Sequence, residues 1–350
     1  MRILVASSGN IVQLAKYPRH FAKMGHEVVF TNPSWRNALC GRTFEDEFGG
    51  LNVRFSTWAD FDHSYRMRSC GRFDVIFGTQ HGAALEVLKY QDRLGIPALL
   101  QILDIADSNL PDILAAQAPL IATYSKIRHL TGINPAIPPQ IEALTGRTDC
   151  DCVFYPVDTE LLDSAPEAQT EDFVLIVSRH TDFKRVDLAL RACAYAKKSI
   201  VLVTQDDHHQ TLHNLARELG FHEAGTGTPD FQFIPLASDR VKASLLRRCK
   251  LHIFTQMWAE APCIPSAEAL YCRKPSIIFD YPAQRAIEGG YSIYVEPGDW
   301  RAMGEAILGV YKDYGSAVEQ ATLGSAWVAA NLAPSVVAQK ILTKLETIAC

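Results

Sequence analysis

Short apolar runs alternate with longer amphipathic segments along almost the whole chain. In the first half, runs typical of buried β-strands cover residues 3–6, 28–31, 53–55, 75–78, 98–103 and 120–123. In the second half, such runs cover residues 173–177, 200–204, 231–234, 251–254 and 276–279, with helical patterns at 186–196, 211–219, 240–248 and 265–271. This alternation predicts an α/β fold of two Rossmann-like, doubly wound parallel sheets with helices on both faces.

Chain length and one polar stretch predict where the domains divide. A chain of 350 residues exceeds what one hydrophobic core usually organises, and the polar stretch 158–172 is linker-like around Asp163-Ser164-Ala165-Pro166-Glu167. We therefore expect an N-terminal domain at 1–160 and a C-terminal domain at 161–333, facing each other across a cleft. Residues 334–350 carry apolar positions at helical spacing and are expected to form a helix that crosses back to the N-terminal domain.

Composition and charge exclude several classes of protein. The chain is 48% hydrophobic, and its 34 Lys+Arg stand against 39 Asp+Glu, which excludes a disordered chain and a polybasic nucleic-acid or membrane module. The first residues predict a strand rather than a signal peptide. No run approaches the ~20 apolar residues of a membrane helix. The nine cysteines are scattered, so we expect reduced thiols in a cytoplasmic protein, with any membrane contact peripheral at the inner membrane face.

The turn after the first strand excludes two common nucleotide-binding classes. It has the sequence Ser7-Ser8-Gly9-Asn10 rather than G-x-G-x-x-G, and the chain contains no G-x-x-x-x-G-K-[ST] loop. Open parallel sheets still offer helix N-termini at the carboxyl ends of their strands, where anions bind. A nucleotide or phosphate remains the expected ligand.

Two acidic and two basic residues stand at strand-loop-helix junctions of the second half. Glu260 follows the run at 251–254, and Glu268 lies eight positions later in a helix that Pro265 can start. A carboxylate can accept hydrogen bonds from both hydroxyls of a ribose or sugar diol, although a Glu in a first helical turn is also common for dipole reasons. Arg179 and Lys184 lie between the run at 173–177 and the helix at 186–196, where two cations suit a diphosphate or form a solvated basic pair.

These stretches resemble the retaining glycosyltransferases of the GT-B fold, of the group 1 or family-four type. The resemblance covers most of residues 150–350 and rests on Glu260 and Glu268, the following Ala269-Leu270 and Lys274-Pro275, the Arg179 to Lys184 block, and Glu296-Pro297-Gly298-Asp299. It implies that Glu260 contacts the donor sugar and Glu268 the nucleotide ribose. It also implies that Arg179 and Lys184 stabilise the leaving diphosphate, and it assigns Ser266 to the donor site. Ser178 and Arg185 replace glycines of the family pattern.

The N-terminal half carries a thinner resemblance. Residues 73–82 are similar to the family's strand that ends in a His near the reacting sugar, and His81 fills that position. The resemblance implies a catalytic or positioning role for His81, and a loop histidine is the alternative. Asp104, at the end of the next predicted strand, is a further candidate.

The resemblance implies an enzyme that moves a sugar from a UDP- or GDP-type nucleotide sugar to an acceptor hydroxyl, with retention of configuration and without a metal or other cofactor. The acceptor stays open among a lipid-linked sugar, a polysaccharide, a small metabolite and a modified DNA base. Asp60-Phe61-Asp62 matches the metal-binding D-x-D of the other major glycosyltransferase fold but lacks its strand context, so we expect a surface loop there. A nucleotide-sugar 2-epimerase and a non-catalytic nucleotide-sugar binding protein remain alternative functions.

Overall fold

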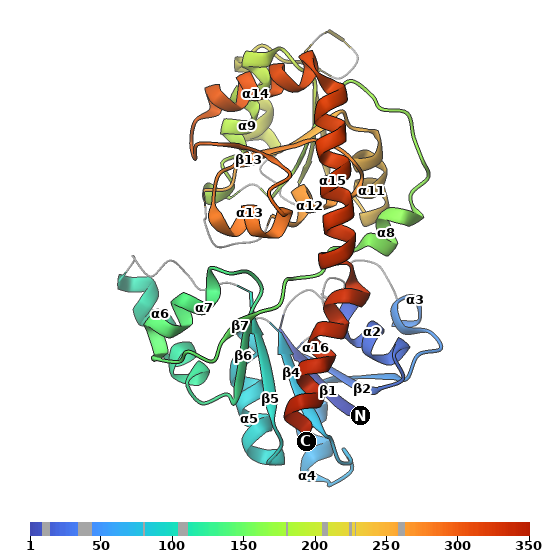
Figure 1. The fold of residues 1–350 in the computed structure, drawn as a ribbon, viewed down its shortest axis with the longest axis vertical. Helices are drawn as coiled ribbons and strands as arrows, with labels where there is room; N and C mark the ends of the chain where they lie inside the picture. The colour runs from blue at the N-terminus through green and yellow to red at the C-terminus, as the bar shows by residue number, and fades with distance from the viewer. Residues whose placement is uncertain are drawn as a thin grey trace. The chain divides into compact units, whose positions relative to one another are not determined.

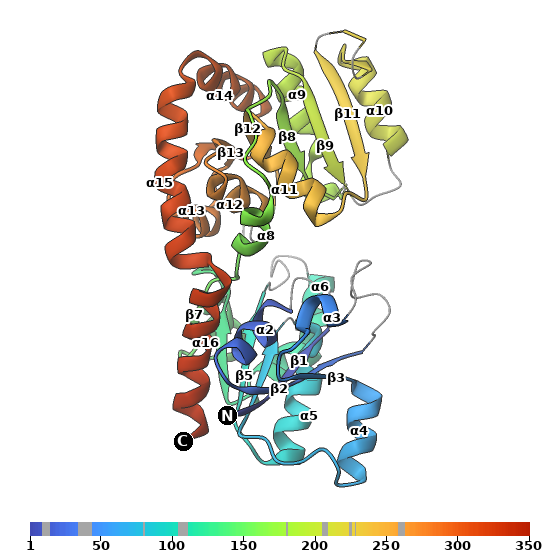
Figure 2. The same ribbon diagram turned by 90° about the vertical axis from the view of Figure 1, so that its right-hand side faces the viewer.

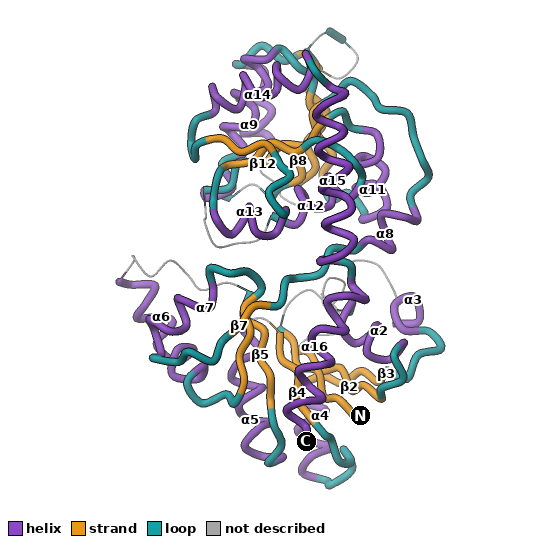
Figure 3. Tube along the Cα trace, in the orientation of Figure 1, coloured by secondary structure: helices purple, strands orange, loops and turns teal. Residues whose placement is uncertain are grey.

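The chain folds into two compact units, each built on its own seven-stranded sheet. The computed structural model describes residues 1–8, 15–33, 44–79, 81–103, 111–179, 181–204, 209–223, 226–227, 229–257 and 263–350, with the side chains of 46, 47, 81, 111–117 and 209 excepted. The first unit comprises Met1–Pro156 and Pro334–Cys350, and the second comprises Val157–Ala333. Figure 3 shows strands flanked by helices in both units, so the α/β class predicted from the sequence is confirmed.

In the first unit the strand order is β3-β2-β1-β4-β5-β6-β7, and every neighbouring pair is parallel. The strands are β1 (Arg2–Ser7), β2 (Glu27–Asn32), β3 (Val53–Thr57), β4 (Val75–Thr79), β5 (Ala98–Ile102), β6 (His129–Gly132) and β7 (Asp151–Cys152). The helices are α2 (Lys16–Lys23), α3 (Phe44–Phe48), α4 (Trp58–Arg66), η1 (His81–Ala83), α5 (Ala84–Leu94), α6 (Pro111–Tyr124), α7 (Ile137–Thr145) and α16 (Pro334–Ala349).

The two faces of this sheet are covered by different helices. Side chains alternate along a strand, so Leu4 and Ala6 of β1 share a core with α4 and α5, while the opposite face meets α2, where the Tyr17 ring lies 5.0 Å from the Phe77 ring. Helix α16 packs against α2 and β4 on that second face and buries Val337, Ile341 and Leu345 (Figures 1 and 2). The final segment of the chain thus belongs to the first unit.

In the second unit the strand order is β10-β11-β9-β8-β12-β13-β14, again parallel throughout. The strands are β8 (Val174–Val177), β9 (Ile200–Thr204), β10 (His222–Glu223), β11 (Asp230–Pro235), β12 (Leu251–Phe254), β13 (Ser276–Phe279) and β14 (Ile293–Val295). The helices are α8 (Thr159–Ser164), η2 (Asp182–Lys184), α9 (Val186–Ala196), α10 (His209–Glu218), α11 (Asp239–Arg248), α12 (Ile264–Tyr271), α13 (Pro282–Glu288), α14 (Trp300–Lys312) and α15 (Tyr314–Leu332).

One predicted strand is wrong. Residues 120–123 lie inside helix α6, and the sixth strand of the sheet is β6, nine residues further along the chain. The apolar, partly β-branched run Leu120-Ile121-Ala122-Thr123 is too short for its periodicity to separate a strand from a buried helix. The Thr123 hydroxyl donates to the Pro119 carbonyl at 2.7 Å, one helical turn back, which is how threonine is accommodated in a helix.

The second unit begins at Val157, a few residues before the boundary expected at 160. The Val157 N–H donates to the Leu332 carbonyl at 2.8 Å, and Asp158 caps helix α8 by accepting from the Leu161 N–H at 3.2 Å. The linker-like residue Asp163 accepts a hydrogen bond from the Tyr271 hydroxyl at 2.8 Å. These contacts make the polar stretch after residue 157 a folded part of the second unit.

One helical stretch, Tyr314–Ala349, is long and apolar enough to cross a membrane by length and composition alone. It consists of α15 and α16, which Ala333 separates, and each buries one side in its own unit. Core helices of soluble proteins pass the same test, so the stretch is weak support for a membrane span.

Candidate functional site

Both sheets change the direction of their strand order at one point. In the first unit this switch lies between β1 and β4, and in the second it lies between β8 and β12. At such a switch the connections leave the sheet in opposite directions, which opens a crevice outside the carboxyl ends of the strands. The segments that follow β8 and β12 carry most of the residues that the sequence assigns to the donor.

Lys184 lies at the switch point of the second unit. It ends the turn η2 after β8, and its ammonium donates a hydrogen bond to the Gln256 amide oxygen just after β12. The Lys184 Nζ also lies 4.8 Å from the centre of the Phe254 ring. Burial is the main reason that the pKa of Lys184 falls to about 8, and the Arg179 guanidinium acts in the same direction. Of the carboxylates that the structure describes, none pairs with Lys184.

The loop between β8 and α9 is fixed by the segment after β12. The Thr255 hydroxyl lies within hydrogen-bond distance of the carbonyls of Lys184 and Arg185, at 2.9 and 2.8 Å, and the Met257 N–H donates to the Phe183 carbonyl at 2.7 Å. Arg185 has a φ of 44°, a left-handed conformation that glycine adopts without steric cost. This explains why the family pattern has a glycine where this chain has Arg185.

The first turn of helix α12 lies at the same edge of the sheet. Its N-terminal flanking residue is Cys263, and no side chain caps it. The Cys263 N–H instead donates to the buried amide oxygen of Gln284 on α13 at 3.1 Å. Lys184 and Cys263 are near enough to influence each other's charge. The partly buried Lys184 ammonium and a helix N-terminus together form an anion-binding arrangement.

Glu268 is paired on one oxygen only. It is 2% exposed, and its Oε1 accepts from the Lys242 ammonium of α11 at 2.8 Å. Its Oε2 is buried without a described hydrogen-bond partner. Burial alone would lower the pKa of Lys242, but the Glu268 carboxylate together with Asp239 and Asp158 outweighs it and the pKa is raised. The ion pair leaves Glu268 with one oxygen available to a hydroxyl donor.

Ser266 points into the protein rather than outward. It is fully buried, its hydroxyl lies 2.8 Å from the Cys263 carbonyl oxygen, and it contacts the carboxyl of Glu288 on α13. The Ser266 side chain is therefore engaged within the second unit, and a contact of this residue with a donor would come from its backbone N–H in the first turn of α12.

At the switch point of the first unit, His81 begins the turn η1 two positions after the last residue of β4. The neighbouring Gly82 lies close to the end of β1, since a Cβ on Gly82 would lie 2.5 Å from the Ser8 Oγ. Only glycine allows that approach. The His81 backbone thus lies at the predicted strand end, while its side chain, and all of Glu260 and Asp104, lie outside what the structure describes.

The D-x-D at Asp60 and Asp62 lies in helix α4 rather than in a loop. The Asp60 N–H donates to the Thr57 hydroxyl at the start of this helix, at 3.1 Å, and Asp62 pairs with Lys89 and Arg93 at 3.0 Å each. Both aspartates therefore bond to neighbouring residues of the first unit. Within the described ranges, no three His, Cys, Asp or Glu residues gather as a metal-binding group.

Several residues of this site carry no signal that the sequence analysis used. Two of them contact residues that the sequence predicted: Gln256 accepts from Lys184, and Lys242 donates to Glu268. The other two, Gln284 and Glu288, contact the first turn of α12. Gln284 and Glu288 stand four residues apart and therefore on one face of a helix, directly after a buried strand. That polar pair on an otherwise apolar helical face is the one sequence signal that could have identified them.

Comparison with known proteins agrees with this architecture. Residues 157–323 match the family described as "Glycosyl transferases group 1". HepE from Anabaena, solved with UDP and glucose, has a TM-score of 0.79 at 15% identity and covers 99% of this chain and 100% of its own. Sucrose-phosphate synthase from Thermosynechococcus elongatus has a TM-score of 0.77 at 11% identity. The match covers 99% of this chain and 98% of that structure's chain. No curated protein matches the chain in sequence.

At these identities the similarity to solved structures establishes a shared fold, the GT-B fold of two Rossmann-like units. The family match covers the unit that holds Lys184, Glu268 and the first turn of α12. The chain has the GT-B fold, and its second unit matches the group 1 glycosyltransferases over residues 157–323, which together support a glycosyltransferase.

Proposed function

We propose that this enzyme transfers a hexosyl or pentosyl group from a UDP- or GDP-type nucleotide sugar to an acceptor hydroxyl. The observation that carries the proposal is Lys184, a partly buried ammonium at the switch point of the sheet whose described hydrogen-bond partner is the neutral amide of Gln256. A cation that is partly removed from water and has no described carboxylate partner is stabilised when an anion binds beside it. The neighbouring N-terminus of α12 favours the same kind of ligand.

A diphosphate bound here accounts for the chemistry of transfer. Negative charge grows on the diphosphate as the bond between the sugar and its phosphate oxygen breaks. Lys184, the exposed Arg179 and the first-turn N–H groups of α12 are the donors that stabilise it, because cations and oriented N–H groups act most strongly where charge develops. Diphosphate binding also restores the ordinary preference of Lys184 for its charged form.

Glu268 is the proposed partner of the nucleotide ribose. Its Oε1 is held by Lys242, which leaves the buried Oε2 to accept a hydrogen bond from a ribose hydroxyl. Glu260 is proposed to contact the donor sugar and His81 to lie near the reacting centre, both from their positions in the sequence. UDP and UDP-glucose are bound by HepE, and this supports a donor of the same chemical class.

We further propose that transfer retains the anomeric configuration and needs no metal ion, in a cytoplasmic enzyme. The acceptor class is a lipid-linked sugar, a polysaccharide, a small metabolite or a modified DNA base. Support for metal independence comes from the charge at the site, since Arg179 and Lys184 supply the cations that a bound metal would otherwise provide.

Donor binding is tested by a thermal-shift panel of UDP, GDP, ADP and their common sugar conjugates. A ligand at ~100 times its Kd stabilises a protein by about 2.7 kcal/mol, so one nucleotide should raise the melting temperature clearly. Lys184→Met should abolish that shift, because it removes the cation at the switch point while keeping a similar side-chain volume. Lys312→Met, at an exposed lysine of α14, is the matched control and should keep the shift.

A panel in which no nucleotide raises the melting temperature, or in which Lys184→Met binds as well as the parent protein, contradicts the proposed donor site. Binding with interconversion of donor sugars in the absence of acceptor would indicate an epimerase instead. Binding with neither transfer nor hydrolysis would indicate a nucleotide-sugar binding protein.

Retention and metal independence are tested together on the transfer product. We expect the proton coupling at the anomeric carbon, measured by NMR, to match that of the donor, and we expect the rate to be unchanged by a chelator. Inversion at that carbon, or a rate that falls with the chelator and recovers with a divalent cation, would contradict the respective part of the proposal.

A further inference from the structure

Helix α13 supports the first turn of α12 through two side chains. Gln284 accepts the Cys263 N–H at 3.1 Å, and Glu288, one turn later, contacts the Ser266 hydroxyl. Both residues are buried, Gln284 to 2% exposure and Glu288 to 0%. The proposed diphosphate site is therefore supported from behind by one amide and one carboxyl group.

The hydrogen atoms at this contact can be counted. The Ser266 hydroxyl has a single hydrogen and two oxygen neighbours, the Cys263 carbonyl at 2.8 Å and the Glu288 Oε1. A carbonyl oxygen can only accept, so both contacts are hydrogen bonds only when the carboxyl supplies the second proton. Tyr294 of β14 donates to the other oxygen, Oε2, at 3.3 Å. The full set of bonds thus requires a protonated Glu288.

We propose that Glu288 is a positioning residue for the diphosphate of the donor and that it must carry a proton when the donor binds. The inference rests on the proposed function and concerns how protonation regulates donor binding at that site. An ionised Glu288 would take the Ser266 hydrogen away from the Cys263 carbonyl. It would also place a buried negative charge directly behind the turn that receives an anion, where little water screens the repulsion.

The surroundings of Glu288 favour the protonated form near neutral pH. Burial raises the pKa of Glu288 to about 7, against smaller opposing effects of Ser266, Ser292 and Tyr294. On the facing elements, burial also raises the pKa of the Cys263 thiol and of the Tyr294 phenol, so both stay neutral in this range.

The nearest cation on α13 itself is committed elsewhere. The Arg285 guanidinium pairs with Asp280 at 2.5 Å and lies 4.1 Å from the centre of the Tyr294 ring. It is half-exposed in that ion pair, whereas Glu288 is fully buried. Among the described residues, Glu288 therefore has neutral contacts, and no described ion pair competes for its proton.

Calorimetric titrations of the whole enzyme with UDP-glucose and GDP-mannose between pH 5.5 and 9 test the proposal. The diphosphate diester of these ligands does not titrate in that range. With a pKa of about 7 for Glu288, loss of its proton should lower the affinity of the parent protein about tenfold from pH 6 to pH 8, and the start of Lys184 deprotonation should lower it about twofold more, as the binding-competent fraction falls. Glu288→Gln mimics the protonated carboxyl, so it should hold its affinity until Lys184 loses its own proton near pH 8.

Proton uptake provides a readout that a merely structural role would not change. In two buffers of different ionisation enthalpy, the parent protein should take up about one proton on binding at pH 7.5, roughly three quarters of it at Glu288 and the rest at Lys184, and Glu288→Gln should keep only the roughly one quarter from Lys184. Glu319→Gln, at an exposed carboxylate of α15, is the matched control and should behave as the parent.

A parent affinity that is flat between pH 6 and 8, or a Glu288→Gln affinity that falls in parallel with it, overturns the inference while the proposed function stands. Failure of both ligands to bind at any pH overturns both.

The free energy of unfolding gives the same test without a ligand. The folded protein holds the Glu288 proton up to about pH 7, whereas the unfolded chain loses it near the ordinary value of a carboxyl. The folded state binds more protons between those values, so stability falls as pH rises through that window. Glu288→Gln should remove this part of the fall, and an unchanged slope would contradict the proposal.

Discussion

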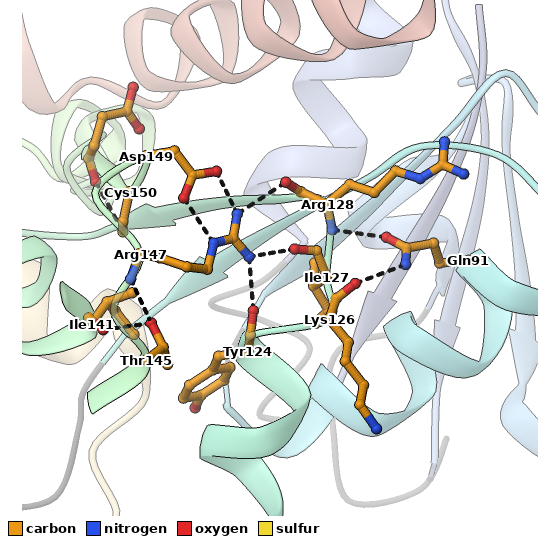
Figure 4. Close-up of polar contacts among 11 residues, drawn as sticks. Gln91, Tyr124, Lys126, Ile127, Arg128, Ile141, Thr145, Arg147, Asp149 and Cys150 are labelled. Carbon is orange, nitrogen blue, oxygen red and sulfur yellow. Dashed lines mark hydrogen bonds and ion pairs between the residues drawn. The ribbon is translucent and has the colours of Figure 1, made fainter. Parts of the chain in front are cut away.

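At the scale of single residues, Arg147 shows how one side chain organises a connection. Its guanidinium donates to the carbonyls of Tyr124, Ile127 and Arg128 at 2.5 to 3.0 Å and to both oxygens of Asp149 (Figure 4). These carbonyls belong to the end of α6 and the loop before β6. The Arg147 side chain is 15% exposed, so the loop carbonyls exchange water for charged donors, which are the stronger kind of hydrogen-bond partner.

We predict that Arg147→Lys destabilises the first unit by about 3 kcal/mol. A single ammonium cannot reach three carbonyls and two carboxylate oxygens, and the carbonyls left behind are partly buried. Urea unfolding measured by fluorescence and circular dichroism checks the size of the effect. Arg128→Lys is the control, because Arg128 contributes backbone groups to this network and its side chain is exposed. Equal stability of the two variants would refute the assignment.

At the scale of elements, the sequence predicted the regular segments better than the contacts between them. The predicted runs at 251–254 and 276–279 and the helix at 186–196 coincide with β12, β13 and α9, because the helix is long enough to show its period and the two short runs stand next to clear helical patterns at 240–248 and 265–271. The run at 120–123 is wrong because a strand and a buried helix share that pattern. Helix α8 was missed because its six residues lie in a polar stretch.

The residues of the candidate site also fall into two groups, those that the sequence predicted and those that it did not. Lys184 and Glu268 were predicted because each follows a strand in a motif of known spacing. Lys242 was not, because nothing in its helical pattern says that a charged residue faces another helix rather than solvent, and Glu288 was missed because its one signal, its place with Gln284 on an apolar helical face, was not used. Their burial comes from the packing of α11 and α13 around α12, which is a property of the folded second unit. The motif thus identifies the residues proposed to meet the donor, whereas the residues that hold them in place are found from the folded second unit.

At the scale of the whole molecule, the two units differ in whether one continuous segment of the chain forms them. The second unit is one uninterrupted segment with its own hydrophobic core, and it contains Arg179, Lys184 and Glu268. The first unit is assembled from Met1–Pro156 and Pro334–Cys350. One face of its sheet is fully covered only when α16 packs beside α2 and against β4.

We predict that the fragment 157–333 folds alone and binds the preferred nucleotide within a few-fold of the intact enzyme. The fragment 1–156 should aggregate or stay partly unfolded, because Val337, Ile341 and Leu345 are missing from its core. Thermal melts and nucleotide titrations of both fragments check this. Joining residue 334 to residue 156 through a short linker should restore a soluble first unit, and a fragment 1–156 that melts cooperatively by itself would contradict the prediction.

The late position of α16 in the chain sets an order for folding during synthesis. A ribosome adds roughly 5–20 residues per second, so the segment between residues 156 and 334 delays the covering helix by roughly 9 to 35 seconds. Throughout that interval the newly made sheet exposes the apolar face that α16 later covers. A chain that stops before residue 334 keeps that face open, which makes it a substrate for chaperones and proteases. The placement of one helix thus lets quality control distinguish a finished enzyme from an interrupted one.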